Sequence, residues 1–83
     1  MFGRKKYKLT ADGWFVGQKK EYHEGQRVEL SFPYIATDTK YSFFVDGAPF
    51  NASYESGRGY VIRFAMPDHD VTVSVTSQNT MLI

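Results

Sequence analysis

The sequence predicts an all-β fold, a small sandwich or barrel of six or seven short strands. Apolar and polar residues alternate with a period of two in several short segments rich in β-branched and aromatic residues. Dipeptides that favour turns separate these segments at intervals of about 8–12 residues. No window shows the sustained apolar period of 3.6 residues that an amphipathic helix needs. With 83 residues, the chain is expected to form one domain, residues 1–83.

The alternation of apolar and polar residues is weaker near the start and in the middle of the chain than elsewhere. Residues 5–10 (KKYKLT) form one candidate, with Tyr7 and Leu9 facing inward. Residues 13–18 (GWFVGQ) and 50–54 (FNASY) are two further candidates. The clearest segments, in which every second residue is apolar, are residues 28–32 (VELSF), 41–45 (YSFFV), 60–66 (YVIRFAM) and 71–77 (VTVSVTS). This alternation predicts antiparallel strands with one buried face.

Turn chemistry separates the predicted strands. Asp12-Gly13 and Asp46-Gly47 are dipeptides that suit the positive backbone angles of a tight hairpin. Glu24-Gly25, residues 56–59 (SGRG) and Met66-Pro67-Asp68 mark three further turns. The order in which the strands pair does not follow from this pattern.

The composition bounds the location of the protein. The chain has no cysteine, which excludes disulfide bonds and thiolate metal sites. The basic opening residues are not followed by the apolar stretch of a signal peptide, and no apolar run approaches the ~20 residues of a membrane span. We therefore expect a cytoplasmic protein without membrane association. A cell-surface location is the alternative if the chain is a piece of a longer exported protein.

Charge is unevenly distributed along the chain. Residues 1–27 hold seven Lys or Arg against three Asp or Glu, whereas residues 28–83 hold three against six. A basic arm can meet nucleic acid, but lysines also protect exposed strand edges, and this second interpretation is favoured. The isoelectric point of about 8.0 lies below the value above 9 that is typical of nucleic-acid-binding domains. Nucleic acid is therefore not the expected partner.

Asp68, His69 and Asp70 are the residues that could hold a metal ion or act as an acid–base group. Two carboxylates and an imidazole are suitable ligands, but the other histidine, His23, stands at no ligand spacing from them. The three residues fall on a predicted turn, where an Asp side chain commonly hydrogen-bonds the backbone two residues on. We interpret them as turn residues and expect no metal site.

No other group of residues predicts catalysis. No serine has the glycine pattern of a nucleophile elbow, and no cysteine can replace it. Gly57-Arg58-Gly59 is too short for a phosphate-binding loop and is predicted to be a hairpin tip. We expect the protein not to be an enzyme and to bind no cofactor.

The closing segment YVIRFAMPDHDVTVSVTS, residues 60–77, resembles the end of small bacterial β-sandwich repeats related to the divergent internalin B-repeat group. In those repeats an aromatic strand ends in Met-Pro, an acidic turn follows, and a last strand alternates Val and Thr. YHEGQRVELSF, residues 22–32, is similar to the segment that places a glycine before an alternating strand. IATDTKYSFFVDG, residues 35–47, resembles small Firmicute proteins. The resemblance covers about residues 22–76 and implies an immunoglobulin-like or ubiquitin-like fold with a spacer or interaction role and no known catalysis.

Several aromatic residues fall outside the inward faces of the predicted strands and are candidates for a binding surface. They are Trp14, Phe15, Tyr22 and Tyr34. Nearby positive charge comes from Arg4, Lys5, Lys6, Lys8, Lys19 and Lys20. Exposed aromatics beside basic groups can stack on sugars or on single-stranded bases. Because a small domain needs most of its aromatics for the core, Trp14 is expected to cap the sandwich.

The expected function is that of a non-catalytic structural or protein-interaction module with an immunoglobulin-like sandwich of six or seven antiparallel strands. Residues 7–16 (YKLTADGWFV) are predicted to form an exposed edge strand, to which a protein partner or a second copy of the chain could add. The alternative is a module that binds carbohydrate or nucleic acid through exposed aromatics and the N-terminal lysines. The candidate surface residues are Trp14, Tyr22, Tyr34, Lys5 and Lys8.

Overall fold

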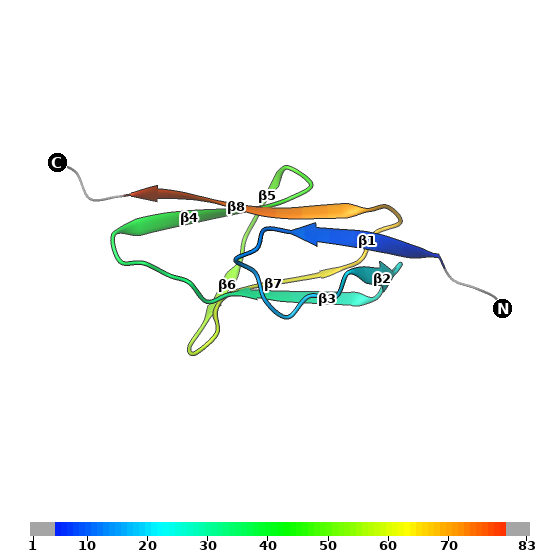
Figure 1. Ribbon diagram of the computed structural model, residues 1–83, viewed down its shortest axis with the longest axis horizontal. Coiled ribbons are helices and arrows are strands. Elements are labelled where there is room, and N and C mark those ends of the chain that lie inside the picture. Colours follow the sequence, from blue (N-terminus) through cyan, green and yellow to red (C-terminus); the bar gives the residue numbers. More distant parts are fainter. Residues whose placement is uncertain (1–4, 80–83) are drawn as a thin grey trace.

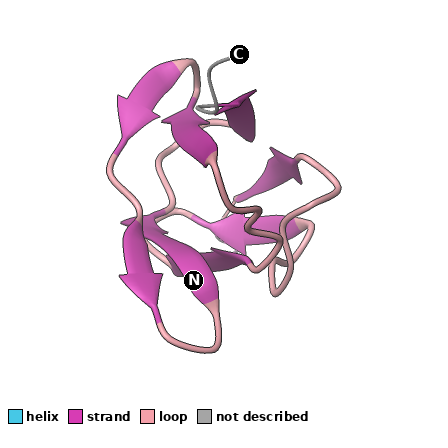
Figure 2. Cartoon of the chain, turned by 90° about the vertical axis from the view of Figure 1, so that its left-hand side faces the viewer, coloured by secondary structure: helices cyan, strands magenta, loops and turns pink. Residues whose placement is uncertain are grey.

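The computed structural model describes residues 5–79, and within this range the chain forms eight strands and no helix (Figures 1 and 2). The strands are β1 (Lys6–Ala11), β2 (Glu21–His23), β3 (Arg27–Phe32), β4 (Thr39–Val45), β5 (Ala48–Phe50), β6 (Ser53–Glu55), β7 (Gly59–Ala65) and β8 (Val71–Asn79). They make a five-stranded sheet in the order β2-β1-β8-β4-β5 and a three-stranded sheet in the order β3-β7-β6. The predicted small two-sheet β-sandwich is confirmed.

The core lies between the two sheets and follows the alternation of the sequence. Val28 and Leu30 of β3 and Val71 and Val73 of β8 are buried, as their inward positions predict. Figure 1 shows β1, β4 and β8 on one side and β3 and β7 on the other. Strict alternation fails in β7, where Val61 is buried as well as its inward neighbour. Val61 is flanked by β3 on one side and β6 on the other, so the three-stranded sheet shields both sides of it.

The first strand is not an edge of the sheet, so the prediction of an exposed edge at residues 7–16 is wrong. β1 pairs antiparallel with β2 over Lys6–Lys8 and parallel with β8 over Leu9–Ala11. This parallel pair departs from the predicted all-antiparallel arrangement. It joins two strands from opposite ends of the described residues 5–79. The lysines of β1 therefore do not protect a free edge.

The two Asp-Gly dipeptides adopt different structures. Asp46 and Gly47 have φ angles of 53° and 79° and close a two-residue hairpin in which Val45 pairs with Ala48. This matches the mirror-image turn that the dipeptide predicts. Asp12-Gly13 instead begins a β-turn in which the Asp12 carbonyl accepts the N–H of Phe15. No hairpin follows, because the next residues leave the sheet.

The weaker predicted strands are only partly present. Residues 13–18 make a single bridge, between Val16 and Ser31, and not a strand. Residues 50–54 are divided, because Phe50 ends β5 in one sheet and Ser53 begins β6 in the other. Between them the chain crosses from sheet to sheet.

A cluster of aromatic rings fills the end of the sandwich where the candidate site lies. Phe32, at the end of β3, lies 5.5 Å from Phe15, 5.1 Å from Tyr41 and 5.5 Å from Phe43, measured between ring centroids. These rings meet at inclined or edge-to-face angles, the arrangements that aromatic pairs prefer. These packed rings lie directly beneath the surface of the candidate site.

In residues 5–79 there is no helix with the length and apolarity needed to cross a membrane.

Candidate functional site

The turn between β7 and β8 holds the residues considered as metal ligands, and each is engaged with the protein itself. The Asp70 carboxylate accepts the backbone N–H of Lys8 at 2.8 Å, which joins the start of β8 to β1. His69 Nε2 lies 2.8 Å from the Asp46 carboxylate in the hairpin between β4 and β5. The Asp68 carboxylate lies 3.5 Å from the other ring nitrogen of His69. The contacts of Asp70 and His69 thus connect chain segments that are distant in sequence, whereas Asp68 contacts its neighbour His69.

The pair formed by His69 and Asp46 shifts the pKa of both groups. The hydrogen bond to Asp46, more than the nearby Asp68, raises the pKa of His69 above 6.5. The pKa of Asp46 is lowered below 3.8, first by the hydrogen bond that its carboxylate accepts from the Thr72 N–H and second by His69. The two pKa shifts are opposite in direction, and each favours the charged form of its group, as expected of an ion pair in which each charge stabilises the other.

The arrangement does not gather ligands for a metal ion. Among residues 5–79, no group of three or more His, Asp or Glu side chains converges as a metal site. His23 lies on β2, where its backbone N–H donates to the Gln26 side chain across a turn. Asp68, His69 and Asp70 lie between β7 and β8, as the turn interpretation expects, but their side chains contact β1, the β4–β5 hairpin and one another, and not the backbone two residues on.

A cleft of about 440 Å³ opens at the other end of β1, above the aromatic cluster. It is lined by Asp12, Gly13, Trp14, Phe32, Tyr34, Tyr41, Val75, Thr76 and Ser77. Trp14 and Tyr34 are its exposed aromatic walls, with 60% and 53% of their surface open to solvent. Their rings meet edge to face, with centroids 5.6 Å apart and an angle of 71° between the planes. Two large aromatic side chains are thus held in fixed mutual orientation at the surface.

Local turns explain why these rings stay outside the core. The β-turn that begins at Asp12 directs Phe15 into the core, where it is 3% exposed, and leaves its neighbour Trp14 on the surface. Tyr34 lies in the loop after β3, and its ring meets that of Phe32 edge to face at 6.4 Å. The Tyr41 hydroxyl accepts the N–H of Ala36 at 2.9 Å and so ties this loop to β4.

Asp12 is the one charged side chain in the lining of the cleft. Its carboxylate Oδ2 accepts the N–H of Val75 at 2.9 Å, and its own N–H donates to the Val73 carbonyl at 3.2 Å. The half-buried carboxylate is therefore held at the point where β1 ends and the cleft begins. It supplies negative charge beside two aromatic faces, a combination suited to binding a cation.

The structure brings together some of the predicted surface residues and separates others. Trp14 and Tyr34 share the cleft, and the expectation that Trp14 caps the core is wrong. Tyr22 is 3% exposed, and its hydroxyl accepts the N–H of Lys19, so its assignment to a binding surface is also wrong. Tyr22 is the middle residue of β2 and faces the core, so its ring is buried although its side chain ends in a hydroxyl.

The N-terminal basic residues lie elsewhere. β1 runs from right to left in Figure 1, so that Lys5 precedes its start and the Trp14 turn follows its end. Lys8 lines a separate depression together with Lys19 and Lys20. Arg4 lies outside the described residues. The lysines and the aromatic cleft are therefore not one surface.

Sequence reasoning did not assign Asp12, Tyr41 or the end of β8 to the site. A carboxylate directly after a strand and before a glycine is the available sign for Asp12, because such a residue often bonds a neighbouring backbone. Nothing local in the sequence places Val75 and Ser77 beside Trp14. That contact depends on the pairing of β1 with β8.

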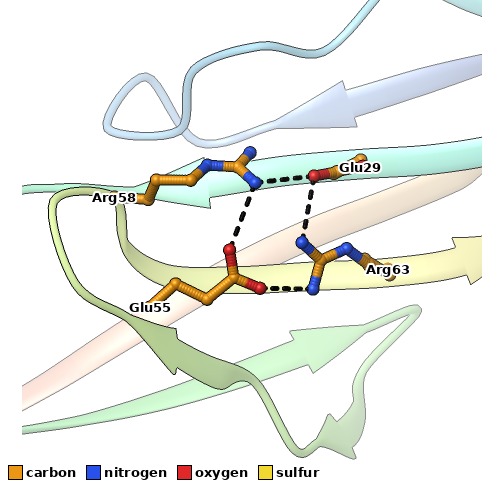
Figure 3. A network of polar contacts seen from close by, with 4 residues as sticks. All are labelled: Glu29, Glu55, Arg58 and Arg63. Carbon is orange, nitrogen blue, oxygen red and sulfur yellow. Dashed lines mark hydrogen bonds and ion pairs between the residues drawn. The ribbon is translucent and has the colours of Figure 1, made fainter.

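A second polar group lies on the three-stranded sheet, where four side chains form a closed network (Figure 3). Arg58 bridges Glu29 at 2.8 Å and Glu55 at 3.3 Å, and Arg63 bridges the same two carboxylates at 3.2 and 2.6 Å. The arginines lower the pKa of both glutamates, through the bond from Arg58 for Glu29 and from Arg63 for Glu55. The four charges cancel, which indicates a structural network joining the three strands and the β6–β7 turn.

Comparison of the chain with models of protein families, with curated proteins and with solved structures gives no match.

Proposed function

We propose that the chain is a non-catalytic protein-interaction module and that the cleft between Trp14 and Tyr34 is its contact surface. The observation that carries the proposal is that Trp14 and Tyr34 are both exposed and lie above a cluster of packed aromatic rings. Tryptophan and tyrosine are enriched among the residues that dominate binding energy at protein interfaces. They contribute large contact area while losing little conformational freedom.

Rigidity of the surroundings supports this proposal. Phe32 packs beneath the cleft, the Asp12 carboxylate holds one wall to β8, and the Tyr41 hydroxyl holds the loop that carries Tyr34. A surface held in this way loses little entropy when a partner binds. The similarity of residues 60–77 to internalin B-repeat domains, which implies a spacer or interaction role, points in the same direction.

A carbohydrate is the second candidate ligand, and the mixed lining of the cleft favours it. Thr76, Ser77 and Asp12 lie beside the aromatic walls, and sugar rings combine an apolar face with many hydroxyl groups. Nucleic acid has no such support, because the lysines lie away from the cleft.

The test is a selection of binding peptides from a random-peptide display library, run beside a glycan array. Trp14 is the one tryptophan of the chain, so its fluorescence reports directly on occupation of the cleft. The proposal expects peptides whose binding changes this fluorescence and is weakened in Trp14→Ala and Tyr34→Ala. The matched control is Tyr54→Ala, because Tyr54 is 65% exposed but lies on β6 outside the cleft.

The outcomes separate the two candidates. Glycan binding with the same dependence on Trp14 and Tyr34 would favour the carbohydrate. Peptides that bind equally well to all variants, or no binder of either kind, would contradict an interaction role for the cleft.

A further inference from the structure

The strand β8 is longer than its neighbour on one side. β1 pairs with β8 only over Val71–Val73, and then turns away at Asp12, whereas β8 continues to Asn79. Figure 1 shows β4 and β8 extending to the left beyond the end of β1. On its other side β8 is paired with β4 from Val73 to Asn79. Residues 75–77 of β8 therefore have a neighbouring strand on one side only, within residues 5–79.

The direction of each backbone group in this segment follows from the observed hydrogen bonds. The Thr72 carbonyl accepts the Asp46 N–H on the β4 side, and the Val73 carbonyl accepts the Asp12 N–H on the β1 side. Because successive residues of a strand face opposite neighbours, Thr76 faces β4, and Val75 and Ser77 face the side that β1 has left. The Val75 N–H is taken by the Asp12 carboxylate. The Val75 carbonyl and both backbone groups of Ser77 have no hydrogen-bond partner among residues 5–79.

The outermost strands of the two sheets are protected, and the parts of β4 and β7 that β5 and β6 leave unpaired each carry a charged residue, Lys40 and Arg63. β2, β5 and β6 are three residues long, and β5 contains Pro49, which has no N–H to donate. The outer side of β3 is partly covered by the bridge from Val16 to Ser31. Short strands and proline are usual means of preventing strand addition. Residues 75–77 carry no charge and no proline, so this edge lacks such protection.

The open edge and the cleft are one surface, because Val75, Thr76 and Ser77 line the cleft beside Trp14 and Tyr34. Building on the proposed function, we propose that β8 accepts an extended segment of a partner protein as an added strand along Val75–Ser77. This strand takes the position that β1 would occupy if it did not turn at Asp12. A lysine or arginine of the segment enters the cleft between Trp14, Tyr34 and the Asp12 carboxylate.

A foreign segment suits this surface better than a second copy of the chain. Two copies joined by their β8 edges would offer each other the uncharged residues 75–77 and a second Asp12 carboxylate, and no cation for the cleft. A long cationic side chain fills it and meets the one charged group in its lining. Cations bind the faces of Trp and Tyr most strongly where water is excluded.

The first test uses the peptides selected against the cleft and changes their backbone. N-methyl groups are placed on alternate residues along one edge of the peptide, or along the other edge as the matched control. An added strand pairs through one edge only, so one methylated peptide is expected to lose at least about tenfold in affinity and the other to bind as before. Hydrogen exchange of the Ser77 amide is expected to slow at least about tenfold in the complex. Equal binding of both methylated peptides would contradict strand addition.

The second test changes the protein. Ser77→Pro removes an N–H that β4 does not use, so the β4–β8 ladder keeps its bonds, and urea unfolding checks that the variant is folded. We expect it to lose about five- to tenfold in peptide affinity, with Gln78→Ala, an exposed β8 residue outside the cleft lining, as the control. Replacing the peptide lysine or arginine by norleucine tests the cation, and Asp12→Asn removes the opposite charge while keeping an acceptor for Val75.

These results distinguish the inference from the function on which it rests. Binding that depends on Trp14 but is unchanged by Ser77→Pro and by either pattern of peptide N-methylation would overturn the added strand. The chain would then still be an interaction module. If the selected peptides contain no lysine or arginine, or if its replacement by norleucine leaves their affinity unchanged, the proposal of a cation in the cleft is overturned. A dimer of the free protein that Ser77→Pro dissociates would replace the foreign segment by a second copy. Failure to select any peptide would remove both proposals.

Discussion

Asp12 and Val75 lie 63 residues apart in the sequence, and a hydrogen bond of 2.9 Å joins the carboxylate of the first to the backbone N–H of the second. The Asp12 carbonyl is occupied by the turn to Phe15, so the side chain makes the bond to β8 in its place. Two other aspartates act in the same way, Asp70 toward the Lys8 N–H and Asp46 toward the Thr72 N–H. Carboxylates thus pair backbone groups where the neighbouring strands stop, and β8 is held at both ends of its pairing.

The Asp12 bond predicts a measurable loss of stability. Asp12→Ala leaves the half-buried N–H of Val75 without its acceptor, and the free energy of unfolding is expected to fall by about 1–2 kcal/mol. Asp12→Asn is expected to cost less, because the amide oxygen can still accept. Urea unfolding of the three proteins measures both effects. Equal losses in the two variants would show that charge, and not the acceptor, matters.

The pair formed by His69 and Asp46 predicts a pH dependence of stability. Since the folded protein raises the pKa of His69 above 6.5, the stabilisation is fully present below 6.5 and is lost as the pH rises through the raised value. For Asp46 the pKa is lowered, so its contribution is present above 3.8 and is lost as the pH falls through the lowered value. The difference in Tm between the protein and His69→Gln should therefore shrink from about pH 5 to about pH 8.

The pKa of His69 itself can be followed by NMR titration of the ring. Asp46→Asn is expected to lower it more than Asp68→Asn does, because the hydrogen bond to Asp46 is the larger cause of the shift. Asparagine also tolerates the positive φ of position 46. The reverse order would assign the shift to Asp68.

The network of Glu29, Glu55, Arg58 and Arg63 predicts sensitivity to acid and to salt. Both glutamates have lowered pKa values, so the stability that the network contributes is present above 4.5 and is lost as the pH falls through the lowered values. The side chains lie at the surface, so added salt should also weaken it. Thermal unfolding of Arg63→Gln at low and high salt measures the effect. Lys40→Gln, an exposed residue outside the network, is the control and should show no such dependence.

Two glycines in one hairpin separate backbone strain from steric overlap. Gly57 and Gly59 have φ angles of 84° and 81°, so alanine is strained at both positions. A Cβ at Gly57 would meet no atom, and Gly57→Ala should cost about 1–2 kcal/mol. At Gly59 a Cβ would overlap the Phe32 carbonyl oxygen and lie 2.9 Å from Pro33 Cα, so the loss should be about 3 kcal/mol or more. Similar losses in urea unfolding would mean that the backbone of β3 moves away easily.

Trp14 and Phe15 are neighbours in the sequence with opposite expected effects. Phe15→Ala removes a ring from the core and should destabilise the protein by about 3–5 kcal/mol. Trp14→Ala removes an exposed ring and should change stability by less than about 1 kcal/mol. Fluorescence of Trp14 in the unmodified protein should be quenched readily by acrylamide. A protected tryptophan whose removal unfolds the protein would contradict the exposed position.

Strand type and approximate bounds could be predicted for the four clearest segments. β3, β4, β7 and β8 begin and end within two residues of the predicted ranges. This agreement has a local cause, since the side chains of any half-buried strand alternate whatever its neighbours are. The hairpin at Asp46-Gly47 is local for the same reason, because two adjacent residues supply its backbone angles.

Pairing order and exposure could not be predicted in this way. Whether residues 7–16 form an edge depends on which strand lies beside them, and the partner of β1 is the last strand of the chain. Trp14 and Phe15 are both aromatic and adjacent, yet one turn leaves Trp14 exposed to solvent and buries Phe15 in the core. Burial depends on what covers a residue, and the covering segments are distant in sequence.

The sequence by itself determined that the chain is an all-β sandwich and that Asp68–Asp70 lie in the connection between two strands. Alternation and turn propensity are properties of a few consecutive residues, so they are visible without a structure. Only the tertiary structure decided that Asp12, Trp14, Tyr34 and the open edge of β8 form one surface. Their meeting depends on a parallel pairing between the two ends of the chain, and such long-range contacts arise from the packing of the whole core.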